Sequence, residues 1–252
     1  MQIEVIIEKK SHKLDAEEGK TILETLQEHG IHVLTAPCGG RGRCGKCTVE
    51  VEHMGEVLAC MTKVTDGMRI TIPKVQLRAQ KSKIAENGTV THYPADDGEG
   101  LDAACDIGTT TVVCHLIDGK TGEKLATVSE PSAQRSFGAD VLSRIQAAEA
   151  GKLEILKEQI IFQIAQMLRT LQKKTGRGEQ IQRLAVVGNT VMCHLFAGIS
   201  PVSIGVTPFM PQEFFGKEYT GEQLGLTDCR SVYIAPAVAG FVGGDITSDL
   251  LA

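Results

Sequence analysis

The sequence predicts two domains of different class, an α+β domain over residues 1–73 and an α/β domain over residues 101–252. In the first part, short strand-like segments and one short helix surround a glycine-rich run of cysteines. In the second part, strands alternate with amphipathic helices, which is the pattern of an α/β fold. Between them, residues 74–100 are polar and aperiodic, as expected of a linker, with a short strand near residues 89–91.

Composition and charge restrict the class of protein. The 252 residues are 42% hydrophobic and 23% charged, as in an ordinary globular protein. The net charge of -5 argues against nucleic acid as the main partner. We expect neither a membrane span nor a signal peptide, because long apolar runs are missing from the sequence. Eight cysteines without a secretion signal favour metal or redox chemistry in the cytoplasm over disulfides.

The first domain is predicted to run strand, strand, helix, loop and further strands. The strands are expected at residues 2–8, 12–15, 47–52 and 68–72. Thr21 can cap the helix, which runs through Glu28 and stops at Gly30. The cysteine loop follows this helix. The order of elements is that of a β-grasp ferredoxin.

The second domain is predicted to contain at least five strands. They are expected at residues 101–107, 112–117, 124–129, 183–187 and 232–235. Helices are expected at residues 139–150 and 152–174, and shorter ones after Thr190 and Gly243. The helix at residues 152–174 has an apolar stripe, and two lysines and Gly176 form a suitable C-terminus.

Four cysteines carry the most specific pattern in the chain. Three form a C-x5-C-x2-C run in APCGGRGRCGKC, and one follows in VLAC. They are Cys38, Cys44, Cys47 and Cys60. Four thiolates are the ligand set of a [2Fe–2S] cluster. The loop glycines allow backbone N–H groups to point at sulfur, and Arg41, Arg43 and Lys46 would stabilise an anionic cluster.

Two other interpretations of these cysteines remain. The first is four buried free thiols, although such thiols normally lie in apolar cores and this loop is rich in Gly and Arg. The second is a four-cysteine zinc site, which usually consists of two short C-x2–4-C pairs. In this chain three of the four cysteines crowd into one loop.

A second candidate site follows the first strand of the α/β domain, in CDIGTTT. Gly108 would let the backbone approach a phosphate closely, and Thr109, Thr110 and Thr111 offer N–H and hydroxyl groups to its oxygens. Asp106 would hold Mg²⁺ or its waters. The alternative is a polar β-hairpin without a ligand.

Polar residues also follow two later strands of this domain. Gly188, Asn189 and Thr190 lie between a strand and a helix, where either phosphate contact or helix capping would use them. Asp245 follows two glycines at the start of another helix. It is a candidate for the N-cap or for a catalytic carboxylate that positions water.

These segments carry two resemblances. TAPCGGRGRCGKCTVEVE and VLACMTKVTDGMRITIP resemble the cluster loop and closing segment of plant- and adrenodoxin-type [2Fe–2S] ferredoxins. The interval between Cys47 and Cys60 is shorter than in those ferredoxins, so a more exposed cluster is expected. DIGTTTVVCHLID, FGADVLSRIQAA, VVGNTVMCHLF and APAVAGFVGGDITSDLLA resemble the first lobe of actin-like (ribonuclease-H-like) ATPases, in the branch of ATP-dependent reductive activators of corrinoid proteins.

The resemblance implies a function. One electron from a low-potential donor would pass through the [2Fe–2S] cluster to Co(II) of a partner corrinoid protein and regenerate Co(I). ATP with Mg²⁺ would drive this uphill step, so the complete protein would be an ATP-dependent cobalt reductase or activase. The cluster potential would be about −400 mV, as in plant-type ferredoxins. The alternative is a [2Fe–2S] electron carrier whose α/β domain is a docking module and does not hydrolyse ATP.

The resemblance also implies parts that the sequence lacks. The superfamily binds ATP between two similar lobes, and a second phosphate loop and a glycine-rich adenosine motif are missing from the sequence. We therefore expect a chain truncated before the second lobe, in which nucleotide binding is weak or absent. The cobalamin motif D-x-H-x-x-G is also missing, so the corrinoid is expected to arrive with a partner protein.

Overall fold

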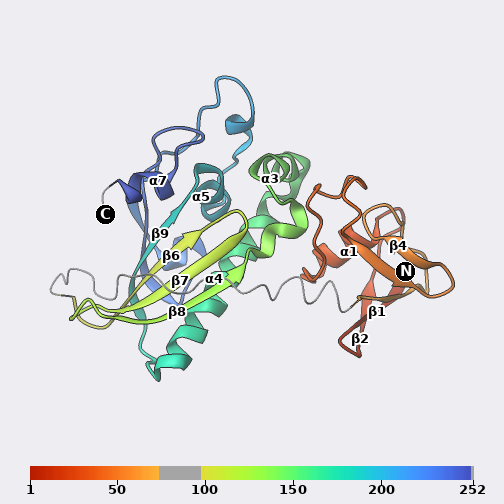
Figure 1. The fold of residues 1–252 in the computed structure, drawn as a ribbon, viewed down its shortest axis with the longest axis horizontal. Helices are drawn as coiled ribbons and strands as arrows, with labels where there is room; N and C mark the ends of the chain where they lie inside the picture. Colours follow the sequence, from red (N-terminus) through yellow and green to blue (C-terminus); the bar gives the residue numbers. More distant parts are fainter. Residues whose placement is uncertain (74–97, 251–252) are drawn as a thin grey trace. The chain divides into compact units, whose positions relative to one another are not determined.

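The structure is a computed structural model, and it describes residues 1–73 and 98–250. It forms two compact units (Figure 1). The described residues of the N-terminal unit are 1–73 and 133–144, and those of the C-terminal unit are 98–132 and 145–250. The predicted strand near residues 89–91 and most of the predicted linker lie outside the described residues. The predicted domain boundaries stay a prediction.

The N-terminal unit is built on a five-stranded mixed sheet with the order β2-β1-β5-β3-β4. The strands are β1 (Gln2–Ile7), β2 (Lys10–Asp15), β3 (Thr48–Val51), β4 (Gly55–Leu58) and β5 (Arg69–Thr71). β1 pairs antiparallel with β2 and parallel with β5. Four of these strands match the predicted ones. β4 was not predicted, because GEVL offers only four residues and no alternation of apolar and polar side chains.

Helix α1 (Ile22–Glu28) begins at the predicted N-cap. The Thr21 hydroxyl accepts a hydrogen bond from the Glu24 backbone N–H, and the Glu24 carboxylate accepts one from the Thr21 backbone N–H. This reciprocal pair satisfies two N–H groups that a helix start leaves free. Beyond the helix Gly30 has a φ of 68°, a conformation that suits glycine and ends the helix.

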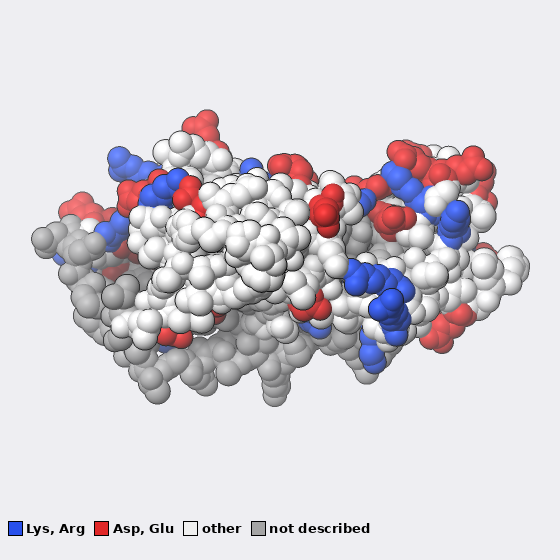
Figure 2. Space-filling model, turned by 90° about the horizontal axis from the view of Figure 1, so that it is seen from above, with Lys and Arg blue, Asp and Glu red and all other residues white. Residues whose placement is uncertain are grey.

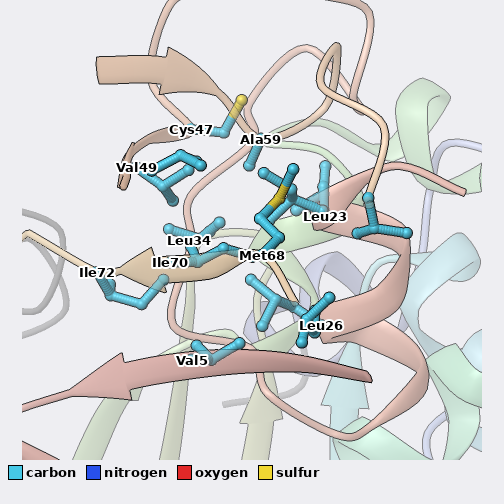
Figure 3. Close-up of a cluster of buried hydrophobic side chains, with 14 of the residues drawn as sticks. Val5, Leu23, Leu26, Leu34, Cys47, Val49, Ala59, Met68, Ile70 and Ile72 are labelled. Atoms are coloured by element: carbon cyan, nitrogen blue, oxygen red, sulfur yellow. The ribbon is translucent and has the colours of Figure 1, made fainter. Parts of the chain in front are cut away.

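The buried side of α1 closes the core of the N-terminal unit over the sheet (Figure 3). Leu23 and Leu26 of α1 pack with Val5 of β1 and Ile70 of β5, and each is at most 4% exposed. Figure 3 places Cys47 at the edge of this core, with its sulfur directed away from the other labelled side chains. The core therefore holds the backbone of one predicted ligand in place and leaves its thiol free to face the loop.

The C-terminal unit contains a six-stranded sheet with the order β10-β11-β9-β6-β7-β8. The strands are β6 (Leu101–Ile107), β7 (Thr111–Asp118), β8 (Lys124–Pro131), β9 (Ile181–Gly188), β10 (Lys217–Thr220) and β11 (Cys229–Ile234). β6, β7 and β8 form an antiparallel meander, whereas β6, β9 and β11 run parallel. The carboxyl ends of these three parallel strands therefore lie at one edge of the sheet.

Helices pack against this sheet and extend its core (Figure 1). Apart from α1, the helical segments are η1 (Ala133–Phe137), α3 (Val141–Ala147), η2 (Ala148–Lys152), α4 (Leu153–Thr175), α5 (Thr190–Ala197), η3 (Val202–Gly205), α6 (Gly221–Leu224) and α7 (Gly244–Asp249). α4 packs against β7 and β8 through the predicted stripe, in which Leu156, Ile160 and Ile164 are fully buried. It ends at Gly176, whose φ of 70° matches the predicted C-terminus.

The predicted helix at residues 139–150 differs from the structure at both ends. It begins only at Val141, and Ala150 and Gly151 leave the helical conformation within a π-type turn. Gly151 has a φ of 82°, which interrupts the apolar periodicity shared by α3 and α4. Within residues 1–73 and 98–250, no helix combines the length and apolarity that a membrane crossing requires.

Candidate iron–sulfur and nucleotide sites

The four predicted ligand cysteines lie together as two pairs. The Cys44 side chain is close enough to the Cys38 sulfur to shift its pKa, and the Cys47 side chain is close enough to the Cys60 sulfur to do the same. Cys38 and Cys60 also interact electrostatically, so the two pairs are neighbours. None of the four forms a disulfide. In a [2Fe–2S] cluster, two cysteines bind each iron, and this pairing offers one pair to each iron.

A short hairpin brings the second pair together. β3 and β4 pair antiparallel, with Thr48 opposite Leu58. Just beyond this pair, the Ala59 N–H donates to the Cys47 carbonyl oxygen at 2.9 Å. The hairpin thus brings the chain back beside Cys47 just before Cys60. The interval between Cys47 and Cys60, which is shorter in sequence than in the ferredoxins, therefore forms one hairpin. This hairpin still brings the fourth predicted ligand to the other three.

The loop around Cys38 favours a negatively charged sulfur. Burial raises the pKa of the Cys38 thiol, but the backbone N–H groups of Cys44, Arg43 and Arg41 and the Cys44 side chain outweigh it, so the pKa falls to about 6. Gly42, between the two arginines, has a φ of 70°. This left-handed turn is the conformation that lets successive N–H groups converge on an anion. The loop is therefore suited to hold thiolates.

Cys60 is in the opposite situation. Burial contributes most to raising its pKa, the neighbouring Cys47 side chain and the charges of Cys47 and Cys38 add to it, and the Gly42 N–H acts against them, so the pKa rises to about 12. Two buried thiolates side by side repel each other, and cationic iron between them would remove this repulsion. The donor set thus fits a metal cluster. In the described part of the chain, no three His, Cys, Asp or Glu side chains converge on one ion position, and a two-iron cluster with two ligands per iron does not require such convergence.

The two cysteine pairs differ in exposure. Cys47 is 1% exposed and Cys60 is 7% exposed, whereas Cys38 and Cys44 are only partly buried. Cys47 and Cys60 belong to the buried core, at whose edge Figure 3 shows Cys47, whereas Cys38 and Cys44 lie in the glycine-rich loop. A bound cluster would therefore approach solvent at the Cys38 and Cys44 side.

Segment 133–144 packs against the residues that flank Cys38 within the N-terminal unit. The Ala139 N–H donates to the Pro37 carbonyl oxygen at 3.2 Å, and the Gln27 side-chain amide donates to the Ser136 carbonyl oxygen at 3.0 Å. A Cβ on Gly39 would lie 3.3 Å from the Phe137 carbonyl oxygen. This segment therefore restrains the start of the cysteine loop, a contact between distant residues that no sequence pattern predicted.

The second candidate site lies in the C-terminal unit, at the carboxyl edge of the parallel strands. Three loops meet there: the loop after β6, the turn between β9 and α5, and the segment before α7. The Asn189 side-chain N–H donates to the Thr109 hydroxyl at 3.1 Å. A Cβ on Gly243 would lie 2.5 Å from both the Asn189 Cα and the Thr190 nitrogen. In open α/β sheets, this is the edge at which ligands bind.

Two predicted carboxylates face each other at this edge. Desolvation by the surrounding protein raises the pKa of Asp106, and the negative charges of Asp245 and Asp249 raise it further, to about 6. Asp249 was not predicted; it lies four residues after Asp245, on the same face of α7, and that spacing is the only signal in the sequence. Mutual repulsion of carboxylates is the setting in which a divalent cation binds favourably.

The structure gives local roles to several of the other predicted residues. Asn189 is the N-cap of α5, since its side-chain oxygen accepts from the Met192 N–H at 3.0 Å. Thr190 is fully buried, and its hydroxyl donates to the Ala239 carbonyl oxygen at 2.7 Å. These contacts favour capping and packing for the two side chains. Gly188 is also constrained by packing, because a Cβ there would lie 2.9 Å from the Ile107 carbonyl oxygen.

One further position differs from expectation. Asp245 is not the N-cap of α7: that position belongs to Gly243, and Asp245 lies in the first turn. The N-cap interpretation is therefore wrong, because close packing requires a residue without a side chain there. At Gly108, a Cβ would lie 2.5 Å from the Thr111 carbonyl oxygen, so the tight hairpin alone requires glycine. Thr110 is exposed beside it.

Two family models match different parts of the chain. A family model described as the RACo middle region matches residues 101–252, and a 2Fe-2S iron-sulfur cluster binding domain matches residues 4–74. The corrinoid activation enzyme RamQ of Eubacterium limosum is 27% identical over 297 residues, covering 86% of this chain and 50% of that protein.

A solved structure shares the fold. The structure titled reductive activator for corrinoid, iron-sulfur protein matches with a TM-score of 0.58 and 24% identity, over 99% of this chain and 57% of that chain. The chain thus spans about half the length of these relatives. The matches confirm the predicted order of a [2Fe–2S] ferredoxin-like domain followed by a mixed α/β domain.

Proposed function

The chain belongs to the RACo middle region family, and we propose that it takes part in the reductive activation of a corrinoid protein. In this proposal, single electrons from a low-potential donor reduce Co(II) of the partner to Co(I). The observation that carries the proposal is the neighbouring arrangement of the pairs Cys38 with Cys44 and Cys47 with Cys60, in a chain that also matches this family. The name of the similar protein RamQ, a corrinoid activation enzyme, supports the choice of partner.

The residues of the loop divide the work of holding a [2Fe–2S] cluster. Cys38 and Cys44 would ligate one iron, and Cys47 and Cys60 the other. The backbone N–H groups that point at the Cys38 sulfur would stabilise the negative charge of the ligated form. When bound, such a cluster takes up and releases one electron, at about −400 mV in plant-type ferredoxins.

The nucleotide part of the proposal rests on the meeting of three loops at the carboxyl edge of β6, β9 and β11. Asp106 and Asp245 would bind Mg²⁺ through oxygen ligands, which this ion prefers. Thr109, Thr110 and the backbone around Gly108 would contact the ATP phosphates. Binding of ATP would then supply the driving force for the uphill electron transfer.

The experiment begins with anaerobic reconstitution of the chain with iron and sulfide, followed by absorption and EPR spectroscopy. We expect a [2Fe–2S] spectrum, which Cys60→Ser loses. Cys193→Ser is the matched control, because that buried thiol only donates to the Gly188 carbonyl oxygen at 3.5 Å and a hydroxyl can replace it. A colourless protein that binds zinc would refute the cluster.

The second step measures cobalt reduction directly. Titanium(III) citrate would reduce the reconstituted chain in the presence of a Co(II) corrinoid protein, and Co(I) is followed by its absorption with and without MgATP. We expect Co(I) to form faster with the wild-type chain than with Cys60→Ser. A cluster-containing chain that transfers electrons at the same rate with and without MgATP would instead favour the simple electron carrier.

A further inference from the structure

The cysteine loop presents positive charge at the surface. Residues 35–47 contain Arg41, Arg43 and Lys46 and no carboxylate, whereas the whole chain has a net charge of -5. Arg41 and Arg43 are exposed, and neither belongs to an ion pair among the described residues. Figure 2 shows Lys and Arg side chains gathered at one place in the half of the view that contains the N-terminal unit.

An exposed methionine lies beside Gly42, the residue between the two arginines in the sequence. Met61 is 62% exposed. It packs on the backbone of Gly42, where an added Cβ would lie 2.8 Å from the methionine sulfur. Large exposed apolar side chains beside arginine are typical of the centre of a protein interface, in which Met and Arg are enriched. We call Arg41, Arg43 and Met61 the loop patch.

The loop patch lies on the part of the loop where a cluster would be closest to solvent. Arg41 and Arg43 fall between Cys38 and Cys44, the more exposed pair of ligands. Met61 directly follows Cys60. A protein that covers the loop patch would therefore bring its own redox centre close to the four cysteines, as electron transfer between proteins requires.

We propose that the loop patch is the docking surface for the electron donor, a small acidic redox protein with carboxylates around its redox centre. This inference rests on the proposed electron-transfer function. Arg41 and Arg43 attract the acidic surface and orient the encounter, and Met61 supplies the apolar contact at its centre. A patch of three side chains suits a weak, transient complex, which is typical of electron-transfer partners. One electron leaves the donor and is taken up at the four-cysteine site, without transfer of a proton or an atom.

The test reverses the charge of the patch. The variant carries Arg41→Glu and Arg43→Glu. The matched control carries Lys10→Glu and Lys13→Glu, which make the same change in net charge at two exposed positions of β2. All chains are first checked for an intact cluster by EPR, and the cluster potential is measured.

The probe donor is the hydroquinone form of an acidic flavodoxin. We measure its dissociation constant for each chain by titration and its rate of electron transfer by stopped flow, as a function of ionic strength. At low salt we expect the patch variant to bind and react at least about tenfold more weakly and slowly than the wild type, and the difference to vanish at high salt. The control variant should stay close to the wild type. Reduced chains should show the opposite trend with cytochrome c, a basic acceptor, which the patch variant should reduce faster.

Three results would overturn the inference. Equal losses in the patch and control variants would mean that only net charge matters. Unchanged binding with a shifted potential would mean that the arginines only tune the cluster. Unchanged binding and unchanged potential would mean that the arginines neither dock the donor nor tune the cluster potential. These results are independent of the proposed function, because the flavodoxin assay contains no corrinoid and cobalt reduction with titanium citrate needs no docking.

Discussion

Replacement of Gly243 by alanine tests the close packing of the segment before α7 against the turn between β9 and α5, at the candidate nucleotide site. Gly243 has a φ of −96°, so its backbone conformation is open to any residue. An added Cβ would instead meet backbone atoms: it would lie 2.5 Å from the Asn189 Cα, 2.5 Å from the Thr190 nitrogen and 2.6 Å from the Gly188 carbonyl oxygen. Backbone atoms cannot move aside as a side-chain tip can, so α7 must shift away from the turn between β9 and α5.

The expected cost follows from these contacts. Overpacking in a tight site destabilises a protein by about 1–3 kcal/mol, and three backbone contacts place this change at the upper end, about 3 kcal/mol. For a chain of this size, each kcal/mol lowers the melting temperature by about 2–4 °C, so Gly243→Ala should lower it by about 6–12 °C.

Differential scanning calorimetry checks this expectation against Gly178→Ala. Gly178 has no atom within 4 Å of an added Cβ and no positive φ, so alanine there should be neutral or stabilising by up to about 1 kcal/mol. The control removes the general effect of glycine replacement on the unfolded chain. If Gly243→Ala melted within about 1 °C of Gly178→Ala, the close approach of α7 to this turn would be wrong.

Three further changes have defined outcomes. Thr21→Ala removes the capping box with Glu24 and should destabilise the N-terminal unit by about 1 kcal/mol in urea unfolding followed by circular dichroism. Burial lowers the pKa of His32 to about 4. Between about pH 6.5 and 4 the unfolded chain therefore binds a proton that the folded chain does not, so the protein becomes less stable as the pH is lowered through this window. His32→Gln should reduce this loss of stability. Asp106→Asn removes a carboxylate whose pKa is raised by desolvation and by the charges of Asp245 and Asp249. Thermal melts at pH 7 should show a more stable chain that no longer responds to Mg²⁺.

Features that depend on nearby residues were predictable from the sequence. Thr21 caps α1 as expected because its partner Glu24 is three residues away. The two-lysine C-terminus of α4 ends at Gly176 as expected for the same reason. The four cysteines were predicted as one ligand set because three of them lie within ten residues of each other, and their spacing limits the shape of the loop.

Features that depend on distant contacts were not predictable. The N-cap of α7 is Gly243 and not Asp245, because the packing of Gly243 against Asn189 sets the start of the helix. Asp249 approaches Asp106 only because α7 runs in the direction that the sheet edge imposes. Strand β4 lacks the alternation of apolar and polar side chains that indicates a strand, and it becomes a strand by pairing with β3.

The hairpin of β3 and β4 explains how a short interval still supports a full ligand set. Cys47 is buried by the core at the start of β3, and its position is fixed by the Ala59 hydrogen bond across the hairpin. Cys60 follows directly, so the buried pair is set by the sheet. Cys38 and Cys44 depend instead on the glycine-rich loop and its converging N–H groups. The rigid pair would anchor a cluster, and the pair on the loop would present it to partners. Electron exchange is therefore expected at the loop side, where the exposed arginines lie.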